Sequence, residues 1–184
     1  MSNSTDEYID ITRSGSSGLY GTISWSRMNP GTSNTNEYAI LIGDNGGAST
    51  NNLIHVTLHH NWYNKTRQRH PIIAGAVIHS YNNYIQWRLW GIHVRRLDST
   101  RGAQMVSEND VFDAAYAPDS SDDDAVKVDD AGNSVRVVNP LLLNGASVQT
   151  QSPDTAFKPS SRYSYGLEPT SAVISSVTGQ AGAT

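Results

Sequence analysis

The sequence predicts an all-β chain built as a solenoid, in which the short strands of successive coils line up in parallel sheets. Strand-like apolar runs alternate with turns rich in Gly, Asn, Ser and Thr along most of the 184 residues. Almost no segment shows helical periodicity over more than two turns. Asparagines follow the strand-like runs at intervals in the range of one solenoid coil.

The spacing of three asparagines gives the coil its period. Asn61, Asn83 and Asn109 each follow a strand-like run, at intervals of 22 and 26 residues. An asparagine at the same turn of successive coils can hydrogen-bond to its neighbours and to the turn backbone. The pattern therefore predicts a ladder of stacked asparagines. The alternative is that these are unrelated turn residues in a chain rich in Asn.

Each predicted strand is an apolar run bounded by turn residues. Turns are expected at Gly15–Gly18 and at Asn29–Thr32, and Gly43 closes a third run before a polar loop. One weak helix is expected at Ser171–Val177. The predicted strands, in chain order, are Tyr8–Thr12, Tyr20–Met28, Tyr38–Ile42, Leu53–Leu58, Ile72–His79, Tyr84–Trp90, Ile92–Val94, Ala103–Ser107, Val126–Val128 and Val135–Val138.

The length of the chain favours one β-helix domain over residues 1–184, with a tail from about residue 150 packing along it. The sequence contains no cysteine, which excludes disulfides and thiolate metal sites. No apolar run approaches the roughly 20 residues that span a bilayer, so no membrane partner is expected. The chain opens without the cationic and apolar segments of a signal peptide.

Charge is concentrated in two segments of opposite sign. Between Lys65 and Arg101 lie seven of the thirteen Lys and Arg residues and one acid, whereas Asp119–Asp130 holds six Asp and one Lys. A cationic segment in a chain of net charge −4 indicates a local anion site. The alternative is that these charges face different ways and are only solvated. Nucleic acid is not an expected partner, because the chain is net acidic and carries no known binding module.

Four ordered segments carry a family resemblance: VTLHHNWYN at residues 56–64, RHP at 69–71, GAVIHSYNNY at 75–84 and SENDVF at 107–112. Together they resemble the pectate lyases, in which a strand ending in His-His-Asn precedes an Arg-x-Pro loop and a His-x-x-Asn-Asn-Tyr segment. The flanking DEYIDIT, TISW, AILIG, RGAQ and YSYGLEPTSAV segments match as well, so the resemblance covers nearly the whole chain. It implies a right-handed parallel β-helix in a short form.

The resemblance also implies a reaction, the calcium-assisted cleavage of polygalacturonate by β-elimination outside the cell. A base takes the proton from carbon 5 of a uronate, and the glycosidic oxygen leaves carbon 4. Arg69 of the Arg-x-Pro loop corresponds to the base of the family. A guanidinium is essentially always protonated in proteins, so pairing of Arg69 with the substrate carboxylate is the alternative role.

Other cations near Arg69 are candidate substrate contacts. Lys65 and Arg67 would bind the acidic polysaccharide from nearby loops. Arg95 or Arg96 could likewise compensate for cations that the family has and this chain lacks. Tyr38 falls where the family has a substrate-binding Lys, and Ala74 falls where it has a second Arg. Each missing charge-assisted contact would remove roughly 1.5–3 kcal/mol of binding energy.

The histidine and carboxylate candidates are less complete. His59 is a candidate substrate contact, and strand alternation places His59 and His60 on opposite faces. Asp6 and Asp10 match two acids of the family's calcium site, and their spacing of four puts both on one face of a regular strand. Calcium takes six to eight oxygens, so two carboxylates alone make a poor site. The alternative is that both are turn or cap residues.

Two other functions compete with an active lyase. The missing cations favour a catalytically weak or inactive β-helix that binds polysaccharide or serves a structural role. A β-helix hydrolase would need paired catalytic carboxylates, but Asp123-Asp124 and Asp129-Asp130 lie in a segment that reads as a loop. A first coil without earlier coils would expose a sheet end, so a homo-oligomer is also expected.

Overall fold

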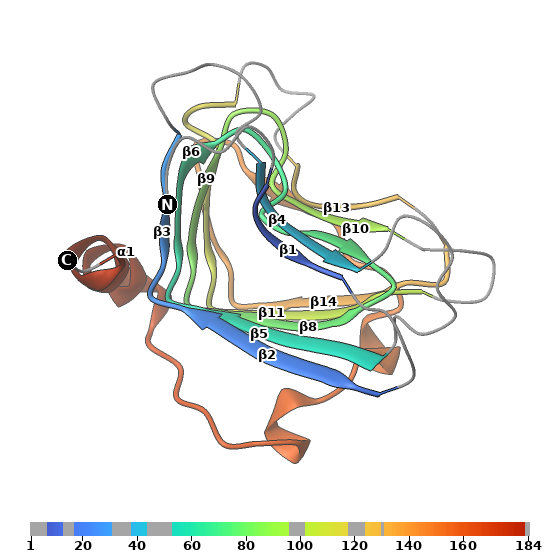
Figure 1. Ribbon diagram of the computed structural model, residues 1–184. Coiled ribbons are helices and arrows are strands. Elements are labelled where there is room, and N and C mark those ends of the chain that lie inside the picture. Colours follow the sequence, from blue (N-terminus) through green and yellow to red (C-terminus); the bar gives the residue numbers. More distant parts are fainter. Residues whose placement is uncertain are drawn as a thin grey trace.

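The chain is a right-handed parallel β-helix, as expected from the sequence (Figure 1). The computed structural model describes residues 7–12, 17–30, 38–43, 53–95, 102–117, 124–129 and 131–182. Three sheets enclose the core, and neighbouring strands within each sheet run parallel.

Each coil contributes one strand to each sheet in turn. Sheet A contains β1 (Glu7–Ile11), β4 (Tyr38–Gly43), β7 (Ile72–Ala74), β10 (Ile92–Arg95), β13 (Asp124–Val128) and β16 (Ser147–Val148). Sheet B contains β2 (Leu19–Ser24), β5 (Ile54–His59), β8 (Val77–Tyr81), β11 (Gln104–Glu108) and β14 (Ser134–Val138). Sheet C contains β3 (Arg27–Met28), β6 (Trp62–Thr66), β9 (Tyr84–Trp87), β12 (Val111–Asp113) and β15 (Leu141–Leu143).

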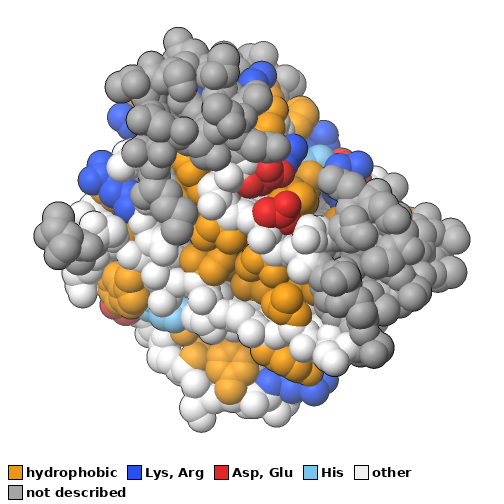
Figure 2. Space-filling view, viewed as in Figure 1, with side chains coloured by type: hydrophobic (Ala, Val, Ile, Leu, Met, Phe, Trp, Pro, Cys, Tyr) orange, Lys and Arg blue, Asp and Glu red, His pale blue; other side chains and the backbone are white. Residues whose placement is uncertain are grey.

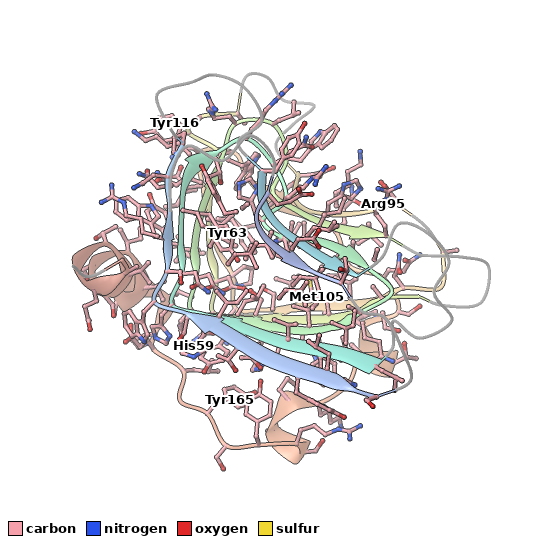
Figure 3. The ribbon with its side chains drawn as sticks, in the orientation of Figure 1. His59, Tyr63, Arg95, Met105, Tyr116 and Tyr165 are labelled. Carbon is pink, nitrogen blue, oxygen red and sulfur yellow. The ribbon has the colours of Figure 1, made fainter. Side chains whose placement is uncertain are left out.

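The core lies inside the three sheets because alternate side chains of each strand point inward. In β5, Ile54, Val56 and Leu58 are buried, whereas the residues between them face outward. Tyr63 and Met105, from sheets C and B, project into the same interior (Figure 3). Each buried aliphatic side chain contributes roughly 1.5–3 kcal/mol, so the stacked coils are held chiefly by this interior.

Two predicted strands are wrong in their extent, because corners interrupt them. The run Tyr20–Met28 is divided into β2 and β3 at Trp25, which has a φ of 51°. The run Ile72–His79 is divided into β7 and β8 at Gly75, which has a φ of 68°. A left-handed residue turns the chain from one sheet to the next, while the apolar pattern continues through the corner.

The ladder is confirmed at two of its three predicted positions. The side-chain amide of Asn61 donates to Oδ1 of Asn83 at 3.0 Å, and the amide of Asn83 donates to Oδ1 of Asp110 at 3.0 Å. The prediction of Asn109 was wrong by one residue. Asn109 is left-handed, with a φ of 53°, and donates to the backbone carbonyl of Glu168. Asp110 takes the ladder position because a carboxylate accepts hydrogen bonds as an amide oxygen does.

The C-terminal segment runs back over the outside of the coils (Figure 1). It contains two short 3₁₀ helices, Pro153–Thr155 and Pro159–Ser161, and ends in α1 (Thr170–Gln180), which is longer than the predicted helix. Val173 and Val177 of α1 are fully buried in a cluster with residues of sheet C. No helix among the described residues is long and apolar enough to cross a membrane.

Figure 2 shows hydrophobic side chains gathered on the end of the stack that faces the viewer. The first coil forms this end, since β1 and β2 are edge strands of their sheets among the described residues. The partly buried Ile9, Ile11, Leu19 and Ile23 belong to the core cluster. The interior is therefore partly accessible from this end in the described part of the chain.

Candidate functional site

The cationic loop of the sequence connects β6 in sheet C to β7 in sheet A. Buried His70 fixes its shape, because Nδ1 lies 2.7 Å from the carbonyl oxygen of Trp90 and Nε2 lies 2.5 Å from the Thr66 hydroxyl. A carbonyl only accepts hydrogen bonds, so Nδ1 donates and Nε2 accepts. Burial lowers the pKa of His70 to about 4, which keeps this neutral form at physiological pH. The residue before Pro71 is therefore a structural anchor.

Arg69 lies just before β7, beside the beginnings of β1 and β4 in sheet A. Its φ is 67°, and its carbonyl accepts a 2.8 Å hydrogen bond from the amide of Ile40. Its guanidinium pairs with the Glu7 carboxylate and lies over the Tyr38 ring, 4.2 Å from the centroid. The Arg69 side chain is 24% exposed and that of Glu7 is 8% exposed. An adjacent carboxylate favours the charged guanidinium, so this arrangement holds Arg69 as a cation.

The other two cations of this region, one near the end of β6 and one in the loop, both precede Arg69 in sequence but have different surroundings. The ammonium of Lys65 lies 4.3 Å from the centre of the Tyr116 ring, which holds it toward the connection after β12. Arg67 is exposed, and its carbonyl accepts a 2.9 Å hydrogen bond from the amide of Leu89. The structure brings Tyr38 together with Arg69, and it leaves Arg67 free to extend into solvent.

The outer face of sheet A carries a second group of charges, which we call the Asp129 cluster: His93, Arg95, Lys127 and Asp129. His93 Nε2 lies 2.5 Å from Asp129 Oδ2, and Arg95 Nε and Lys127 Nζ lie 4.0 and 3.9 Å from Asp129 oxygens. Burial lowers the pKa of His93, and the Asp129 carboxylate opposes that shift. Arg95, labelled in Figure 3, projects outward from sheet A.

Strand register explains the position of Arg95. It pairs with Ala74 of the neighbouring coil, which stands where the family has an arginine. Arg95 therefore places a cation one coil further along, at the same register position of the sheet. Sequence reasoning missed His93 and Asp129, and it missed Glu7 as the partner of Arg69. The strand register brings these charges together, since His93 of β10 pairs with Lys127 of β13.

His59 does not join this site, because it ends β5 in sheet B. Figure 3 places it outside that sheet, and its ring stacks on Tyr81 at 4.9 Å. The expectation that His59 and His60 face opposite ways was wrong: their Nδ1 atoms are 2.9 Å apart. His60 has a φ of 54°, so strand alternation ends there. Burial lowers the pKa of His59 to about 4, and His60 and His79 add to that shift.

The described carboxylates do not fit a calcium site. Asp6 lies outside the described residues, and Asp10 is exposed on β1, paired in register with Leu41. Glu7, the nearest acid to the loop, is engaged by Arg69. No group of three or more His, Asp or Glu side chains in the described part of the chain is arranged to hold a metal ion. Calcium requires more oxygen ligands than this arrangement supplies.

Comparison with curated proteins gives partial matches to two lyases. The chain is 29% identical over 154 residues to a pectin lyase of Pectobacterium carotovorum, covering 80% of this chain and 44% of that protein. It is 33% identical over 81 residues to pectate lyase C of Dickeya chrysanthemi, covering 44% of this chain and 20% of that protein. The chain thus spans less than half the length of these relatives.

Solved structures share the fold. A pectate lyase from Acidovorax avenae subsp. citrulli superposes with a TM-score of 0.70 at 24% identity, covering 97% of this chain and 42% of that one. A pectate lyase from Bacillus sp. N165 in complex with trigalacturonate gives 0.69 at 22% identity, covering 96% and 52%. The family model described as pectate lyase matches residues 2–184. With its three parallel sheets and a match over this whole range, the chain belongs to the pectate lyase family.

Proposed function

We propose that the chain is a polysaccharide lyase that cleaves polygalacturonate by β-elimination, with Arg69 as the catalytic residue. The position of Arg69 carries the proposal. Its guanidinium lies against Glu7 and Tyr38, the first residues of two strands of sheet A. Arg67 lies in the same loop, and Lys65 lies near the end of β6 just before it. The Bacillus relative in complex with trigalacturonate supports an acidic polysaccharide as the ligand.

In the proposed reaction, hydroxide from the solvent takes the proton from carbon 5 and becomes water. The bond from carbon 4 to the glycosidic oxygen breaks, the departing oxygen takes a proton from water, and a double bond is left between the two carbons. Negative charge develops next to the uronate carboxylate during this step. A planar guanidinium can bind both oxygens of that carboxylate and stabilise the charge. Arg69 is suited to this role because Glu7 keeps it charged. Proton removal by Arg69 would require the loss of the charge that Glu7 stabilises.

The neighbouring residues take supporting roles in this proposal. Tyr38 holds the plane of the Arg69 guanidinium by stacking beneath it. Lys65 and Arg67 attract the anionic chain to the loop. Arg95, in register with Ala74, supplies a cation on the outer face of sheet A.

Calcium dependence stays a prediction. Asp10 is the described acid that matches the family, and the described carboxylates do not complete a cage around an ion. We therefore assign no step of the reaction to calcium. A requirement for the ion would indicate that Asp6 or other residues outside the described ranges supply further oxygens.

A polysaccharide-binding module without catalysis is the second candidate. Two observations favour it: the Arg69 guanidinium is already paired with Glu7, and Tyr38 and Ala74 stand where the family has cations. Such a module would bind the polymer through Lys65, Arg67 and Arg95 and leave it intact.

Ultraviolet absorbance of unsaturated uronate products decides between these functions. Polygalacturonate is supplied with calcium and then with a chelator to the wild type, Arg69→Ala and the control Lys158→Ala, which removes an exposed cation far along the chain. We expect product from the wild type and the control, and a loss of about 10²-fold in Arg69→Ala. If the chain binds polygalacturonate but forms no product at any pH, the binding module is supported. If it neither binds the polymer nor forms product, both functions are rejected.

The proposed location follows from the proposed substrate. A polymer of this size does not enter a cell, so we propose that the chain acts outside it. Self-association stays a prediction, which light scattering at micromolar concentration tests.

A further inference from the structure

Sheets A and B form different sides of the triangular coil (Figure 1). A pocket lies on the outer face of sheet B, whereas Arg69 contacts residues of sheet A. The volume of the pocket is about 740 Å³, within the range of small-molecule sites. Side chains of β2, β5, β8 and β11 form its floor, and the C-terminal segment forms its other wall. We call it the sheet B pocket; it is lined by Tyr20, Gly21, Thr22, His55, Val56, Thr57, Val77, His79, Gln104, Phe157, Arg162 and Tyr163.

Two stacked rings form a flat surface in this pocket. Tyr20 pairs in register with His55, and their rings stack with centroids 4.9 Å apart and planes 14° apart. Tyr20 is 76% exposed, so the face of its ring that is not packed on His55 is open to a ligand. A Cβ on Gly18 would come within 2.8 Å of this ring, so the glycine leaves the space that Tyr20 occupies.

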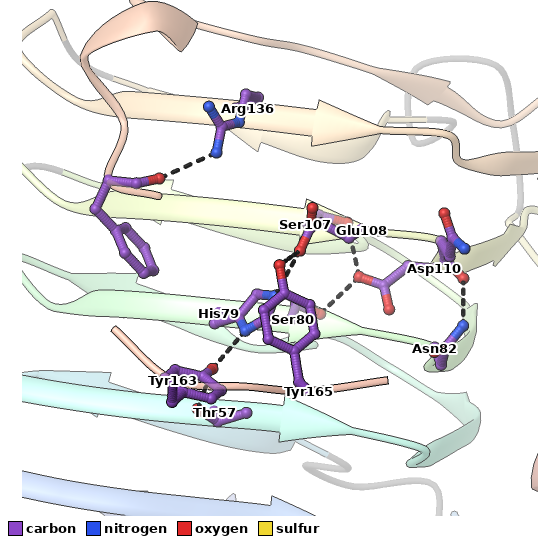
Figure 4. Close-up of polar contacts among 12 residues, drawn as sticks. Thr57, His79, Ser80, Asn82, Ser107, Glu108, Asp110, Arg136, Tyr163 and Tyr165 are labelled. Carbon is purple, nitrogen blue, oxygen red and sulfur yellow. Dashed lines mark hydrogen bonds and ion pairs between the residues drawn. The ribbon is translucent and has the colours of Figure 1, made fainter. Parts of the chain in front are cut away.

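A hydrogen-bonded relay fixes the polar wall of the pocket (Figure 4). The Tyr163 hydroxyl lies 2.9 Å from the Thr57 hydroxyl and 2.5 Å from His79 Nδ1, and His79 Nε2 lies 2.9 Å from Glu108. His79 is 2% exposed, so the relay is held within the packed structure. Tyr163 is thereby fixed in place before any ligand binds, which lowers the entropic cost of binding.

Arg162 gives the pocket its charge. It is exposed beside Tyr163, and it is the one Lys or Arg among the lining residues, which include no Asp or Glu. Glu108 lies behind the wall, where it bonds to His79 and to the Tyr165 hydroxyl. A guanidinium without a carboxylate in the same lining complements an anionic ligand, and its planar fork matches a carboxylate.

From this combination we propose that the sheet B pocket binds an acidic sugar ring, with its apolar face on Tyr20 and its carboxylate on Arg162. The positive C–H edges of a pyranose suit the negative face of an aromatic ring. The hydroxyls of Thr22, Thr57 and Tyr163 offer hydrogen-bond partners to the sugar hydroxyls. The choice of a uronate rests on the proposed function, and the pocket is a second, non-catalytic site for the same polymer.

With two separate sites, the sheet B pocket would hold one segment of a polymer while Arg69 acts on another segment of the same polymer or of a second one. Linked binding events raise the effective concentration of the second site, so a long polymer would bind more tightly than a trimer. The avidity would be lost when either site is removed.

Calorimetric titration with trigalacturonate tests the proposal in the wild type, Tyr20→Ala, Arg162→Gln and Arg69→Ala, with Lys158→Gln as a matched control in the same segment. We expect two sites in the wild type and in the control. Tyr20→Ala and Arg162→Gln should each weaken one site by at least tenfold and leave the other unchanged. In NMR spectra, the Tyr20 ring signals should shift with trigalacturonate and less with its methyl ester, which lacks the charge.

Isotherms of Tyr20→Ala and Arg162→Gln that match the wild type would overturn the proposal, as would equal binding of the methyl ester. The two proposals fail in different ways. Absence of unsaturated product, with one site still sensitive to Arg162→Gln, would reject the lyase and keep the sheet B pocket. Normal product formation, with no site sensitive to Arg162→Gln, would reject the sheet B pocket and keep the lyase.

Discussion

The guanidinium of Arg69 has two possible partners, the Glu7 carboxylate beside it and the carboxylate of a bound uronate. Because both compete for the same fork of donors, Glu7→Gln should free the guanidinium and tighten the binding of trigalacturonate. We expect up to about tenfold, since a charge-assisted contact contributes roughly 1.5–3 kcal/mol and part of that is lost to solvent. Calorimetric titration measures the change. Weaker binding in Glu7→Gln would mean instead that Glu7 positions Arg69.

Asp110 makes the ladder sensitive to pH. Burial raises its pKa to about 6, although Ser107, Ser80 and Asn83 donate hydrogen bonds to it. The unfolded value is about 3.9, so the folded state binds the proton more tightly. This contribution to stability is complete below about pH 4 and is lost as the pH rises through 6. Asp110→Asn, which has no proton to lose, should therefore stabilise the protein by about 1–3 kcal/mol at pH 7.5 and by little at pH 4.

Thermal unfolding at the two pH values measures the effect, and Asp113 supplies the contrast. Burial raises the pKa of Asp113, but hydrogen bonds from Asn144, Tyr84 and others hold it below its ordinary value. Its contribution is present above the unfolded pKa and is lost as the pH falls, so Asp113→Asn should destabilise at pH 7.5. If both variants shift the melting temperature in the same direction at that pH, the assignment for Asp110 is refuted.

At the scale of the elements, the strands were predictable and the corners were not. Apolar runs in the sequence identified β4, β5 and β10 as strands. Their apolar residues either alternate with polar residues or follow one another directly. Trp25 does not indicate a corner in the sequence, since an aromatic residue within an apolar run favours a strand. Its left-handed backbone is imposed by the coil around it, which a local pattern does not contain.

The same limit explains the ladder and the site. Asn109 and Asp110 are adjacent polar residues after β11, and only the register of β11 with β8 decides which one faces inward. For the site, the motif located Arg69, but its partner Glu7 lies on another coil, and nothing near either residue in sequence pairs them. Contacts between coils could be predicted where one residue type recurs at the coil period, as for Asn61 and Asn83, whereas the contacts of Asp110 and Glu7 required the register.

Helix α1 is held on sheet C by few side chains, so a single truncation should be measurable. Val177→Ala removes methyl groups from a fully buried position and leaves a cavity. We expect a loss of about 1–3 kcal/mol in the free energy of unfolding, measured by urea titration. Ser175→Ala on the exposed side of the same helix is the control and should change it by less than about 0.5 kcal/mol. Equal effects of the two variants would contradict the packing of α1.

For the whole molecule, the balance of charge predicts how binding depends on salt. The chain carries a net charge of −4, so an anionic polymer is attracted by local groups of cations and not by the overall charge. The affinity for polygalacturonate should fall as salt rises. Replacing Lys65 and Arg67 by Gln should reduce the slope of log affinity against log salt by about one unit per cation. Lys158→Gln should leave that slope unchanged.

The C-terminal segment joins coils that are distant from one another in the stack. The Arg136 guanidinium of β14 donates to the carbonyl of Phe157 at 3.1 Å, and the amide of Gly182 donates to the carbonyl of Trp25 in the first coil at 2.8 Å. In a simple solenoid each coil stabilises only its neighbours, so unfolding can proceed from one end. Here the segment contacts both the first and later coils, so these coils should unfold together instead of one after another. Because it follows every coil in the chain, it can close only after the last of them has been made, so nascent chains should stay sensitive to proteases until that moment.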